Sequence, residues 1–194
     1  MDTRIDVAIV GGGVAGLSAA LFLTRAEKST VVFDEGKQRI LTVDTVREFA
    51  GFDGLSPADM LARIRGEATR YGAEVRRTYV ERVHPREDGA FDVLAGGSVA
   101  IAHALVLATG LIDVLPELNG LSDVWGREIG ICPCFDGYER RETRFVVFGV
   151  PERLKQFASW VSIWSHDVKV VTPAPLDDEA RLKFQALHLR KHLS

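Results

Sequence analysis

Both cysteines of the chain lie in one short segment, ICPCFDG, at residues 131–137. Cys132 and Cys134 are separated by one proline, and Asp136 follows them. Two cysteines this close are typical of redox chemistry, because thiol–disulfide exchange needs two sulfurs within bonding reach. A disulfide across C-x-C is strained, and strain makes a disulfide a better oxidant. A thiolate at Cys132 would be favoured if that residue began a helix.

Two other interpretations of the cysteine pair stay open. The segment could be a relic that loop packing holds in place, with no redox role. A metal site is the weakest alternative, because a structural zinc site needs four ligands and the chain has two cysteines. The nearest histidines, His103 and His166, are far from the pair in the sequence. We therefore predict no metal site.

A glycine-rich loop near the N-terminus, VGGGVAGLSAA, carries the strongest motif of the chain. Gly11, Gly13 and Gly16 match G-x-G-x-x-G between an apolar run and a helical pattern. In this motif the first glycine allows a tight turn, the second lets the backbone approach a pyrophosphate, and the third lets helix and strand pack closely. The helix N-terminus then offers N–H groups and a partial positive charge to the phosphates. The loop predicts a bound dinucleotide; the alternative is that its glycines only pack a helix.

An acid stands where the next strand is expected to end. Asp34 follows Gly11 by roughly 20 residues, the distance at which a carboxylate accepts the ribose hydroxyls of a dinucleotide. An acid at this position favours a free 2′-hydroxyl, and so FAD or NAD over NADP. The pattern of residues alone does not separate FAD from NAD.

The loop is expected to belong to a strand–helix–strand unit. The β-branched runs IDVAIV (5–10) and TVVF (30–33) are typical of buried strands, and residues 17–25 between them have helical spacing. A helix is predicted at 57–71 with Ser56 as its N-cap, after a loop at 36–57.

Strands are expected to fill the middle of the chain. Residues 74–83 alternate as a strand does, and 91–94 and 98–101 flank Ala95-Gly96-Gly97, a hairpin signal. The run ALVLA (104–108) predicts a further buried strand, ending at Thr109-Gly110.

The C-terminal part of the chain is expected to repeat the first pattern. Residues 111–144 are expected to be a connection. Strands at 144–148 and 167–171 then enclose a helix at 152–163, and a last helix is predicted at 177–192. The fold class predicted from these elements is α/β with doubly wound, Rossmann-like units.

Composition and charge limit the class of protein. The chain has 194 residues, of which 46% are hydrophobic and 26% charged, as in soluble globular proteins. A net charge of −3 gives no electrostatic reason to expect nucleic acid or an anionic membrane as partner. No apolar run reaches the roughly 18 residues of a membrane helix. The N-terminus does not read as a signal peptide, so we expect a cytoplasmic protein.

Taken together, these segments resemble the low-molecular-weight thioredoxin reductase family, and most of all its branch of dithiol oxidases in natural-product biosynthesis. The resemblance covers essentially the whole chain and rests on VGGGVAGLSAA, VVFDEGKQR, FAGFDGLSPADML, ALVLATG and WGREIGICPCFDGYE. The last segment looks like the family's active-site stretch, where C-x-x-C is followed by Asp-Gly and an aromatic residue. ALVLATG is similar to the segment with which flavoproteins return to the FAD domain, which favours FAD over NAD.

The resemblance implies FAD on the first unit, NADPH on the second and a dithiol between them. Electrons would pass from NADPH through flavin to the disulfide, or in the oxidases from the dithiol through flavin to oxygen. Cys132 would be the exchanging thiol, Cys134 its partner and Asp136 the proton donor. The residues expected to bind the cofactor are Gly11, Gly13, Val14, Ala15, Gly16, Asp34, Glu35, Gly36, Val83, Ala108, Thr109 and Gly110.

Two departures from the family concern the redox centre and the second nucleotide loop. The family places its cysteines where Cys132 and Phe135 stand here, so a phenyl ring replaces the sulfur that faces the flavin. In the second loop Gly149 keeps the first glycine, but Pro151 stands at the second glycine position. Proline has no N–H and a fixed φ, so it cannot cradle a phosphate as glycine does. NADP(H) binding is therefore disfavoured.

A third departure is length. The family continues through the rest of the pyridine-nucleotide domain and returns to the FAD domain with a Gly-Asp pair, and this sequence has no Gly-Asp pair. We expect a FAD-binding domain portion at 1–113, with a small antiparallel insertion, and a partial pyridine-nucleotide-like domain at 114–194.

The expected function is a FAD-dependent oxidoreductase of the thioredoxin reductase type, acting on small-molecule or protein thiols and disulfides as a homodimer. NADPH is disfavoured as its electron partner, and the sequence does not identify that partner. The alternative is a non-catalytic flavin- or nucleotide-binding module that serves as a regulator or subunit.

Overall fold

The computed structural model describes residues 4–130 and 132–172. The chain divides into two compact units, one formed by Met1–Val46 and Gly51–Asp123, the other by Arg47–Ala50 and Val124–Ser194. Each unit is described by itself. The helix predicted at 177–192 lies outside the described residues.

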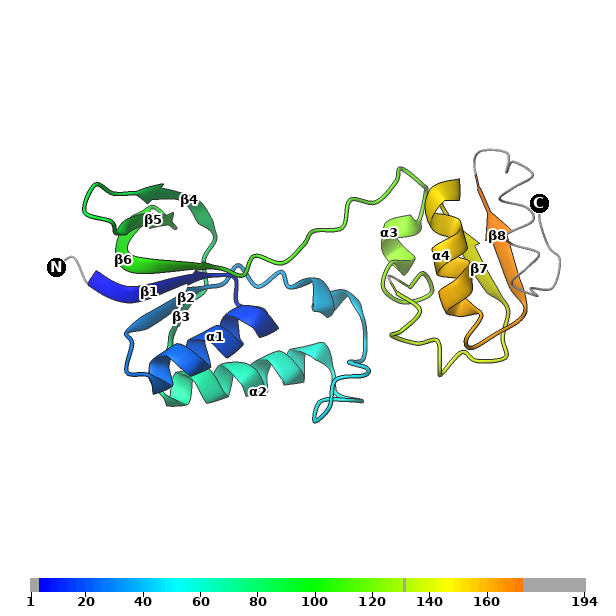
Figure 1. Ribbon diagram of the computed structural model, residues 1–194, viewed down its shortest axis with the longest axis horizontal. Helices are drawn as coiled ribbons and strands as arrows, with labels where there is room; N and C mark the ends of the chain where they lie inside the picture. The colour runs from blue at the N-terminus through cyan, green and yellow to red at the C-terminus, as the bar shows by residue number, and fades with distance from the viewer. Residues whose placement is uncertain (1–3, 131, 173–194) are drawn as a thin grey trace. The chain divides into compact units, whose positions relative to one another are not determined.

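The first unit is built on one six-stranded sheet with the order β3-β2-β1-β6-β5-β4 (Figure 1). Its strands β1, β2, β3 and β6 are parallel neighbours, while β4 and β5 join antiparallel. The strands are β1 (Arg4–Val10), β2 (Thr30–Phe33), β3 (Glu74–Arg76), β4 (Val80–Pro85), β5 (Phe91–Ala95) and β6 (Ser98–Leu107). Two helices, α1 (Val14–Arg25) and α2 (Pro57–Arg70), complete the unit together with a short 3-10 turn, η1 (Arg39–Thr42). The predicted α/β class is confirmed.

Alternation along the parallel strands directs side chains into two separate cores. Ile9 and Val32 face α1 and α2, where they form a cluster with Ala68. Their neighbours Ala8 and Val31 face the opposite way and pack with residues of β5. In Figure 1 the two helices accordingly lie on one side of β1–β3, and the β4–β5 hairpin lies on the other. The central residues of β1 and β2 are therefore buried between the helices and the β4–β5 hairpin.

Several local predictions in this unit are confirmed. Helix α2 begins at Pro57, and the Ser56 hydroxyl accepts a hydrogen bond from the Asp59 backbone N–H at 3.1 Å, as an N-cap does. The β5–β6 hairpin closes through Gly96 and Gly97, whose φ angles of +56° and +73° are those that a type I′ turn requires.

Two strand predictions were wrong. Residues 74–83 form two strands instead of one: β3 pairs with β2, whereas β4 pairs with β5 in the other layer. The chain changes layer at Arg77–Tyr79, which alternation along the sequence cannot reveal. Conversely, the strands predicted at 98–101 and 104–108 are one strand, β6, which pairs with β5 at its start and with β1 along the rest.

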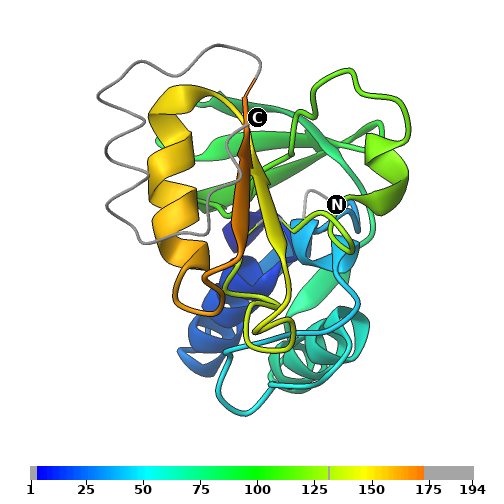
Figure 2. The same cartoon turned by 90° about the vertical axis from the view of Figure 1, so that its right-hand side faces the viewer.

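The second unit contains a parallel strand–helix–strand motif, as predicted. Strands β7 (Phe145–Phe148) and β8 (Val168–Val171) pair in parallel, and α4 (Pro151–Val161) connects them (Figure 2). Leu154 and Ala158 of α4 pack against Val147 and Val170 in one buried cluster. A short helix, α3 (Leu121–Val124), contains the point in the sequence at which the chain passes from the first unit to the second.

None of the helices described within residues 4–130 and 132–172 is long and apolar enough to cross a bilayer. Contacts divide the chain after Asp123, whereas the sequence suggested a division after residue 113. The assignment of the two units to FAD and pyridine nucleotide stays a prediction.

Candidate functional site

The glycine loop joins β1 to α1 at the carboxyl edge of the parallel strands, and two of its glycines are required by close backbone contacts. Gly11 has a φ of +111°, and a Cβ there would lie 2.1 Å from the Ala108 carbonyl oxygen. A Cβ at Gly16 would lie 1.9 Å from the Gly11 carbonyl oxygen. Side chains cannot be accommodated at these distances, so these two glycines fix the turn and the helix–strand packing.

Gly13 differs from Gly11 and Gly16, because the space beside its Cα atom is open. Its backbone is extended, with φ −79° and ψ −174°, and it is the N-cap of α1. A Cβ there would meet only the Gln38 Cγ atom, at 3.7 Å. Val14 and Ala15 follow in the first turn of α1, where backbone N–H groups lack helical partners. This edge can take an anionic diphosphate at the positive end of the helix.

Asp34 lies directly beneath the loop and its carboxylate is engaged within the protein. Its Oδ1 atom accepts hydrogen bonds from the Gly36 N–H at 2.8 Å and from Gln38 Nε2 at 2.6 Å. Its Oδ2 atom accepts one from Arg65 Nη2 at 2.8 Å. Asp34 is only 1% exposed. The acid expected to accept ribose hydroxyls is thus buried among protein donors.

Gly12 and Gln38 complete this support, and the sequence analysis missed both. A Cβ at Gly12 would lie 2.4 Å from the Asp34 Cγ atom, so only glycine lets the loop rest on this carboxylate. Gln38 Nε2 also donates to the Gly12 carbonyl oxygen at 3.2 Å. The unbroken GGG run at residues 11–13, one glycine more than the motif needs, was the available signal for Gly12. Nothing in the sequence marked Gln38.

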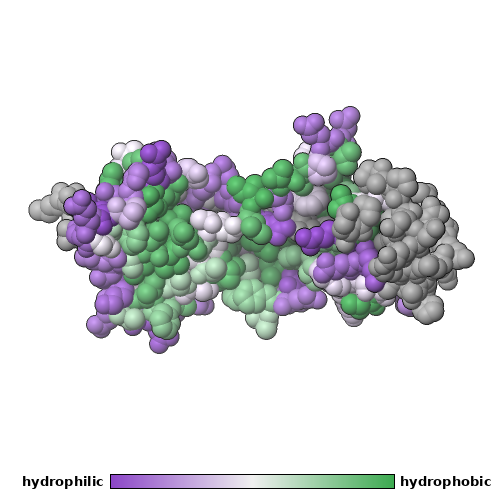
Figure 3. Space-filling model, turned by 45° about the horizontal axis from the view of Figure 1, so that its top comes forward, coloured by the Kyte–Doolittle hydropathy of each residue, from purple (hydrophilic) through white to green (hydrophobic). Residues whose placement is uncertain are grey.

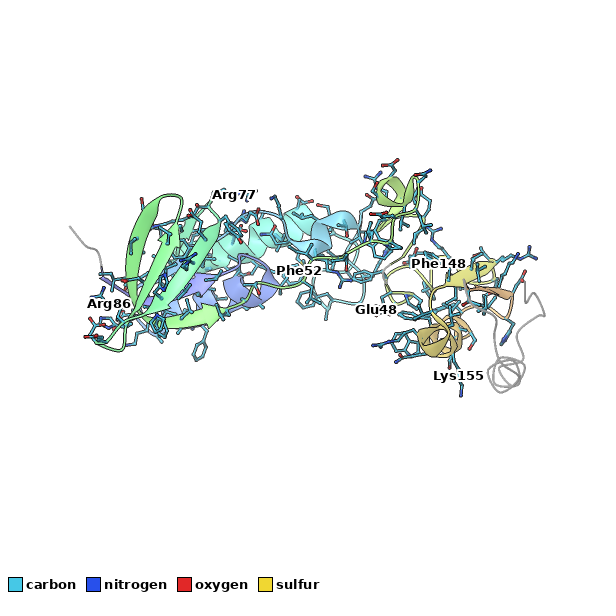
Figure 4. The ribbon with its side chains drawn as sticks, turned by 90° about the horizontal axis from the view of Figure 1, so that it is seen from above. Glu48, Phe52, Arg77, Arg86, Phe148 and Lys155 are labelled. Atoms are coloured by element: carbon cyan, nitrogen blue, oxygen red, sulfur yellow. A yellow bond between two sulfur atoms is a disulfide. The ribbon has the colours of Figure 1, made fainter. Side chains whose placement is uncertain are left out.

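Two arginines, also missed, converge on the same strand end. Arg65 comes from α2 and donates to Asp34, while Arg77, which follows β3, brings its Nη1 atom to 3.7 Å from Asp34 Oδ2. A Cβ at Gly36 would lie 2.1 Å from Arg77 Nη2, so this guanidinium lies over Gly36. Figure 4 labels Arg77, which is largely exposed. No pattern in the sequence indicated that either arginine contacts Asp34, because both lie far from it along the chain.

The exposed acid at this edge is Glu35. Its side chain is 39% exposed and pairs with the Lys37 ammonium. The hydrogen bond and the charge of Glu35 raise the pKa of Lys37. Beside Arg77 a pocket of about 280 Å³ opens between Phe33, Arg76, Thr78 and the β5–β6 hairpin.

The remaining predicted binding residues divide into two groups. Ala108 touches the loop, since its N–H donates to the Val10 carbonyl at 2.9 Å and its own carbonyl lies against Gly11. Thr109 and Gly110 follow it and are exposed. Val83 lies elsewhere: it sits in β4, opposite Val93, and packs against the core between the two layers.

Cys132, Cys134 and Asp136 belong to the second unit, and the two cysteines are joined by a disulfide. The Cys134 N–H donates to the Cys132 sulfur at 3.4 Å. The segment is a series of turns and no helix begins at Cys132. Asp136 Oδ2 pairs with Arg140 Nε at 2.5 Å.

A tryptophan fixes the turns behind the cysteines. A Cβ at Gly137 would lie 2.6 Å from ring atoms of Trp164 and 2.4 Å from the Pro133 carbonyl oxygen. Gly137 is therefore required for packing whatever chemistry the cysteines perform. Within residues 4–130 and 132–172, no group of three or more His, Cys, Asp or Glu side chains could hold a metal ion.

The second glycine loop, between β7 and α4, has a different geometry from the first. Gly149 has a φ of +151°. Pro151 begins α4 directly after the N-cap, Val150. Leu154 is 1% exposed and fills the region where a small residue would let helix and strand approach. A loop with proline at its second position presents fewer N–H donors to a phosphate.

Known proteins share both the sequence and the fold. Residues 5–150 match the family described as pyridine nucleotide-disulphide oxidoreductase. The chain is 36% identical over 141 residues to thioredoxin reductase tcpT of Claviceps purpurea, covering 71% of this chain and 44% of that protein. It is 31% identical over 153 residues to thioredoxin reductase of Treponema pallidum, covering 77% of this chain and 49% of that protein. The chain thus spans about half the length of these relatives.

Among solved structures, HlmI superposes with a TM-score of 0.91 at 33% identity, over 97% of this chain and 61% of that chain. The oxidoreductase from Agrobacterium tumefaciens gives a TM-score of 0.89 at 30% identity, over 97% and 64%. The family match spans the glycine loop, the β6 strand end, the disulfide segment and the start of the second loop. The chain belongs to the pyridine nucleotide-disulphide oxidoreductase family.

Proposed function

We propose that this chain is a FAD-dependent oxidoreductase that acts on thiols and disulfides. Two features of this family member together carry the proposal. The glycine loop leaves space at Gly13 for a dinucleotide, and Cys132 and Cys134 form a disulfide. Relatives named thioredoxin reductases support the same reaction class.

The residues of the glycine loop fit FAD. Gly13 leaves room for a diphosphate at the N-terminus of α1, while Gly11 and Gly16 hold the loop in shape. Thr109 and Gly110 follow β6 at the same edge. When bound, FAD would supply the two-electron couple that a disulfide and a dithiol can share.

The disulfide supplies the exchange chemistry. A substrate thiolate attacks one sulfur, forms a mixed disulfide and releases the other cysteine as a thiolate. A second substrate thiolate then breaks the mixed disulfide, so that the substrate loses two electrons and the Cys132–Cys134 pair gains them. The Cys134 N–H, 3.4 Å from the Cys132 sulfur, would stabilise a thiolate there. Asp136, held by Arg140, would carry the proton.

NADPH is not included in the proposal. Pro151 removes a donor from the second loop and Leu154 fills its inner side. This loop also supports the second candidate function, a nucleotide-binding regulator or subunit without turnover. A homodimer remains a prediction. Exposed hydrophobic side chains support this prediction, such as those of Ile112 and Val114, which are 90% and 93% exposed. Figure 3 shows hydrophobic residues on the surface in green.

Reconstitution with FAD followed by anaerobic titration with dithionite tests the proposal. We expect a yellow protein that takes up four electrons, two for flavin and two for the disulfide. The matched control is Cys134→Ser, which keeps the flavin and takes up two. A protein that stays colourless with FAD would overturn the flavoenzyme assignment, and wild-type uptake of two electrons would favour the non-catalytic module.

A further inference from the structure

An ion pair joins two segments of the first unit that are far apart in the sequence. Arg39 begins η1, which follows β2, and Asp113 lies in the segment that follows β6. Arg39 donates through Nε to both Asp113 oxygens at 2.9 Å, and its Nη2 atom lies 2.8 Å from Oδ1. Two nitrogens of the guanidinium thus engage one carboxylate, the geometry in which arginine holds an acid most specifically.

The ion pair spans the point at which the strand order of the sheet reverses. Strand β2 pairs with one side of β1, and β6 pairs with the other side. In open α/β sheets the crevice at the carboxyl ends of the strands at such a point is where ligands bind. Arg39 comes from the β2 side of this crevice and Asp113 from the β6 side, while the glycine loop follows the strand between them.

Contacts on both sides connect the ion pair to the glycine loop. On the β6 side, a Cβ at Gly11 would lie 3.2 Å from the Thr109 Cα atom, so the start of the segment touches the loop. On the β2 side, Gln38 precedes Arg39 and donates through Nε2 to the Gly12 carbonyl oxygen at 3.2 Å. The loop, the two flanking segments and the ion pair therefore form a closed ring of contacts.

Packing does not hold the segment that carries Asp113. Leu111, Ile112 and Val114 are 71%, 90% and 93% exposed, and the two residues before Leu111 are exposed as well. A stretch with so few buried side chains samples many conformations unless polar contacts restrict it. The Asp113 side chain supplies such a contact, because it fastens the stretch to η1.

We infer that the Arg39–Asp113 ion pair is a positioning device for the dinucleotide site, an inference that rests on the proposed binding of FAD at the glycine loop. The pair holds residues 109–113 at the crevice before the ligand arrives, so binding does not have to order them. Arg39 and Asp113 act through the two segments that they join, without contacting the ligand.

Equilibrium titration with FAD, followed by flavin fluorescence, tests this role in Arg39→Gln, in Asp113→Asn and in the double variant. Fixing the backbone of one residue corresponds to about a tenfold change in an equilibrium constant, so each single variant should bind FAD about tenfold more weakly. The double variant should bind no more weakly than either single variant, because loss of one partner already frees the segment. The thermal unfolding midpoint of the ligand-free protein should stay close to that of the wild type, because surface ion pairs add little to global stability.

Limited proteolysis of the ligand-free proteins reports the loosening of the segment directly. Proteinase K should cut within residues 109–114 several-fold faster in both single variants than in the wild type, with the site of cleavage identified by mass spectrometry.

The matched control is Arg86→Gln, which breaks an ion pair of similar exposure, with Asp92 at 2.9 Å. Arg86, labelled in Figure 4, follows β4 at the end of the hairpin that pairs, through β6, with the start of β1. This is the amino edge of the sheet, away from the glycine loop. The control should keep the FAD affinity and the cleavage rate of the wild type.

Exchange of the two side chains, Arg39→Asp with Asp113→Arg, separates positioning from direct contact. A pair that acts by joining two segments should recover most of the affinity that the single variants lose. If the affinity stays low because the guanidinium itself holds the diphosphate, the positioning role is wrong.

The inference would also be overturned if either single variant bound FAD as the wild type does, or if the two losses multiplied in the double variant. These results would leave the proposed function intact, since the wild type would still bind FAD. A wild-type protein that binds no FAD would overturn the proposed function, and the inference with it.

Discussion

The Gly13→Ala variant should fold like the wild type and bind FAD more weakly. Alanine tolerates the backbone angles of Gly13, φ −79° and ψ −174°, because they lie in the broad extended region. The added methyl group would meet only Gln38 Cγ, at 3.7 Å, which is ordinary van der Waals contact. The substitution therefore changes the open face of the loop and leaves its interior unchanged.

The expected change in stability is a small difference between two opposing effects. Restricting the unfolded chain by Gly→Ala stabilises by about 0.4–1 kcal/mol where the native angles allow alanine. Gly13 is the N-cap of α1, where alanine is less favourable than glycine by about 0.5–1 kcal/mol. The net change in the free energy of unfolding should lie within about 0.5 kcal/mol of zero.

The expected change in binding is larger. A methyl group on the surface that a diphosphate approaches acts as overpacking, which costs about 1–3 kcal/mol. At 1.4 kcal/mol for each factor of ten, this corresponds to about a 5- to 150-fold weaker affinity for FAD. Because the methyl group also separates the ligand from the helix N-terminus, the loss should be greater at low salt.

Denaturant unfolding and FAD fluorescence titration measure the two quantities separately. Gly16→Ala is the matched control, since its methyl group would lie 1.9 Å from the Gly11 carbonyl oxygen. That variant should lose about 1–3 kcal/mol of stability or more. The reasoning would be refuted if Gly13→Ala destabilised the protein as much as Gly16→Ala, or if its FAD affinity equalled that of the wild type.

Three further outcomes are expected. Leu154→Ala, which removes a fully buried side chain, should destabilise the second unit by about 2–5 kcal/mol in denaturant unfolding; a loss below 1 kcal/mol would contradict the packing described. The Ser29 N–H bonds to Asp6 and lowers the pKa of that carboxyl from its ordinary value of 3.8. The stabilisation by the Asp6 carboxylate is therefore present above pH 3.8 and lost as the pH falls through the folded-state pKa. Asp6→Asn should make the unfolding midpoint depend less on pH in the acid range. A pH dependence equal to that of the wild type would count against this role of Asp6. Iodoacetamide should label Cys132 in Cys134→Ser at lower pH than Cys134 in Cys132→Ser, because the N–H at residue 134 faces the Cys132 sulfur; the reverse order would exclude that role for the N–H.

The sequence predicted most reliably what the backbone itself requires. Gly11 and Gly16 could be assigned because a tight turn and a helix–strand contact exclude any Cβ, and this need appears as a spacing of residues. The I′ hairpin at Gly96-Gly97 and the Ser56 cap are local for the same reason. Such features depend on a few neighbouring residues and leave a clear pattern in the chain.

Features that depend on tertiary partners could not be predicted in this way. The environment of Asp34 is set by Arg65, which comes from another helix and carries no motif. The division of residues 74–83 into two strands depends on which neighbour each half finds, while the alternation of side chains continues across the break. The motif located the acid, and the side chains packed around it determine what that acid can bind.

Strand β6 couples the β4–β5 hairpin to the parallel strands of the first unit, because it pairs with both β5 and β1. Ile101 and Ala102 pair with β1 on one side and with β5 on the other, so the β4–β5 hairpin cannot detach without exposing an edge of the parallel strands. Amide hydrogens at these residues should exchange only when the whole unit opens. Ala108, one residue beyond the end of the same strand, touches Gly11. A ligand held by the glycine loop would therefore slow hydrogen exchange in a hairpin on the opposite face of the sheet.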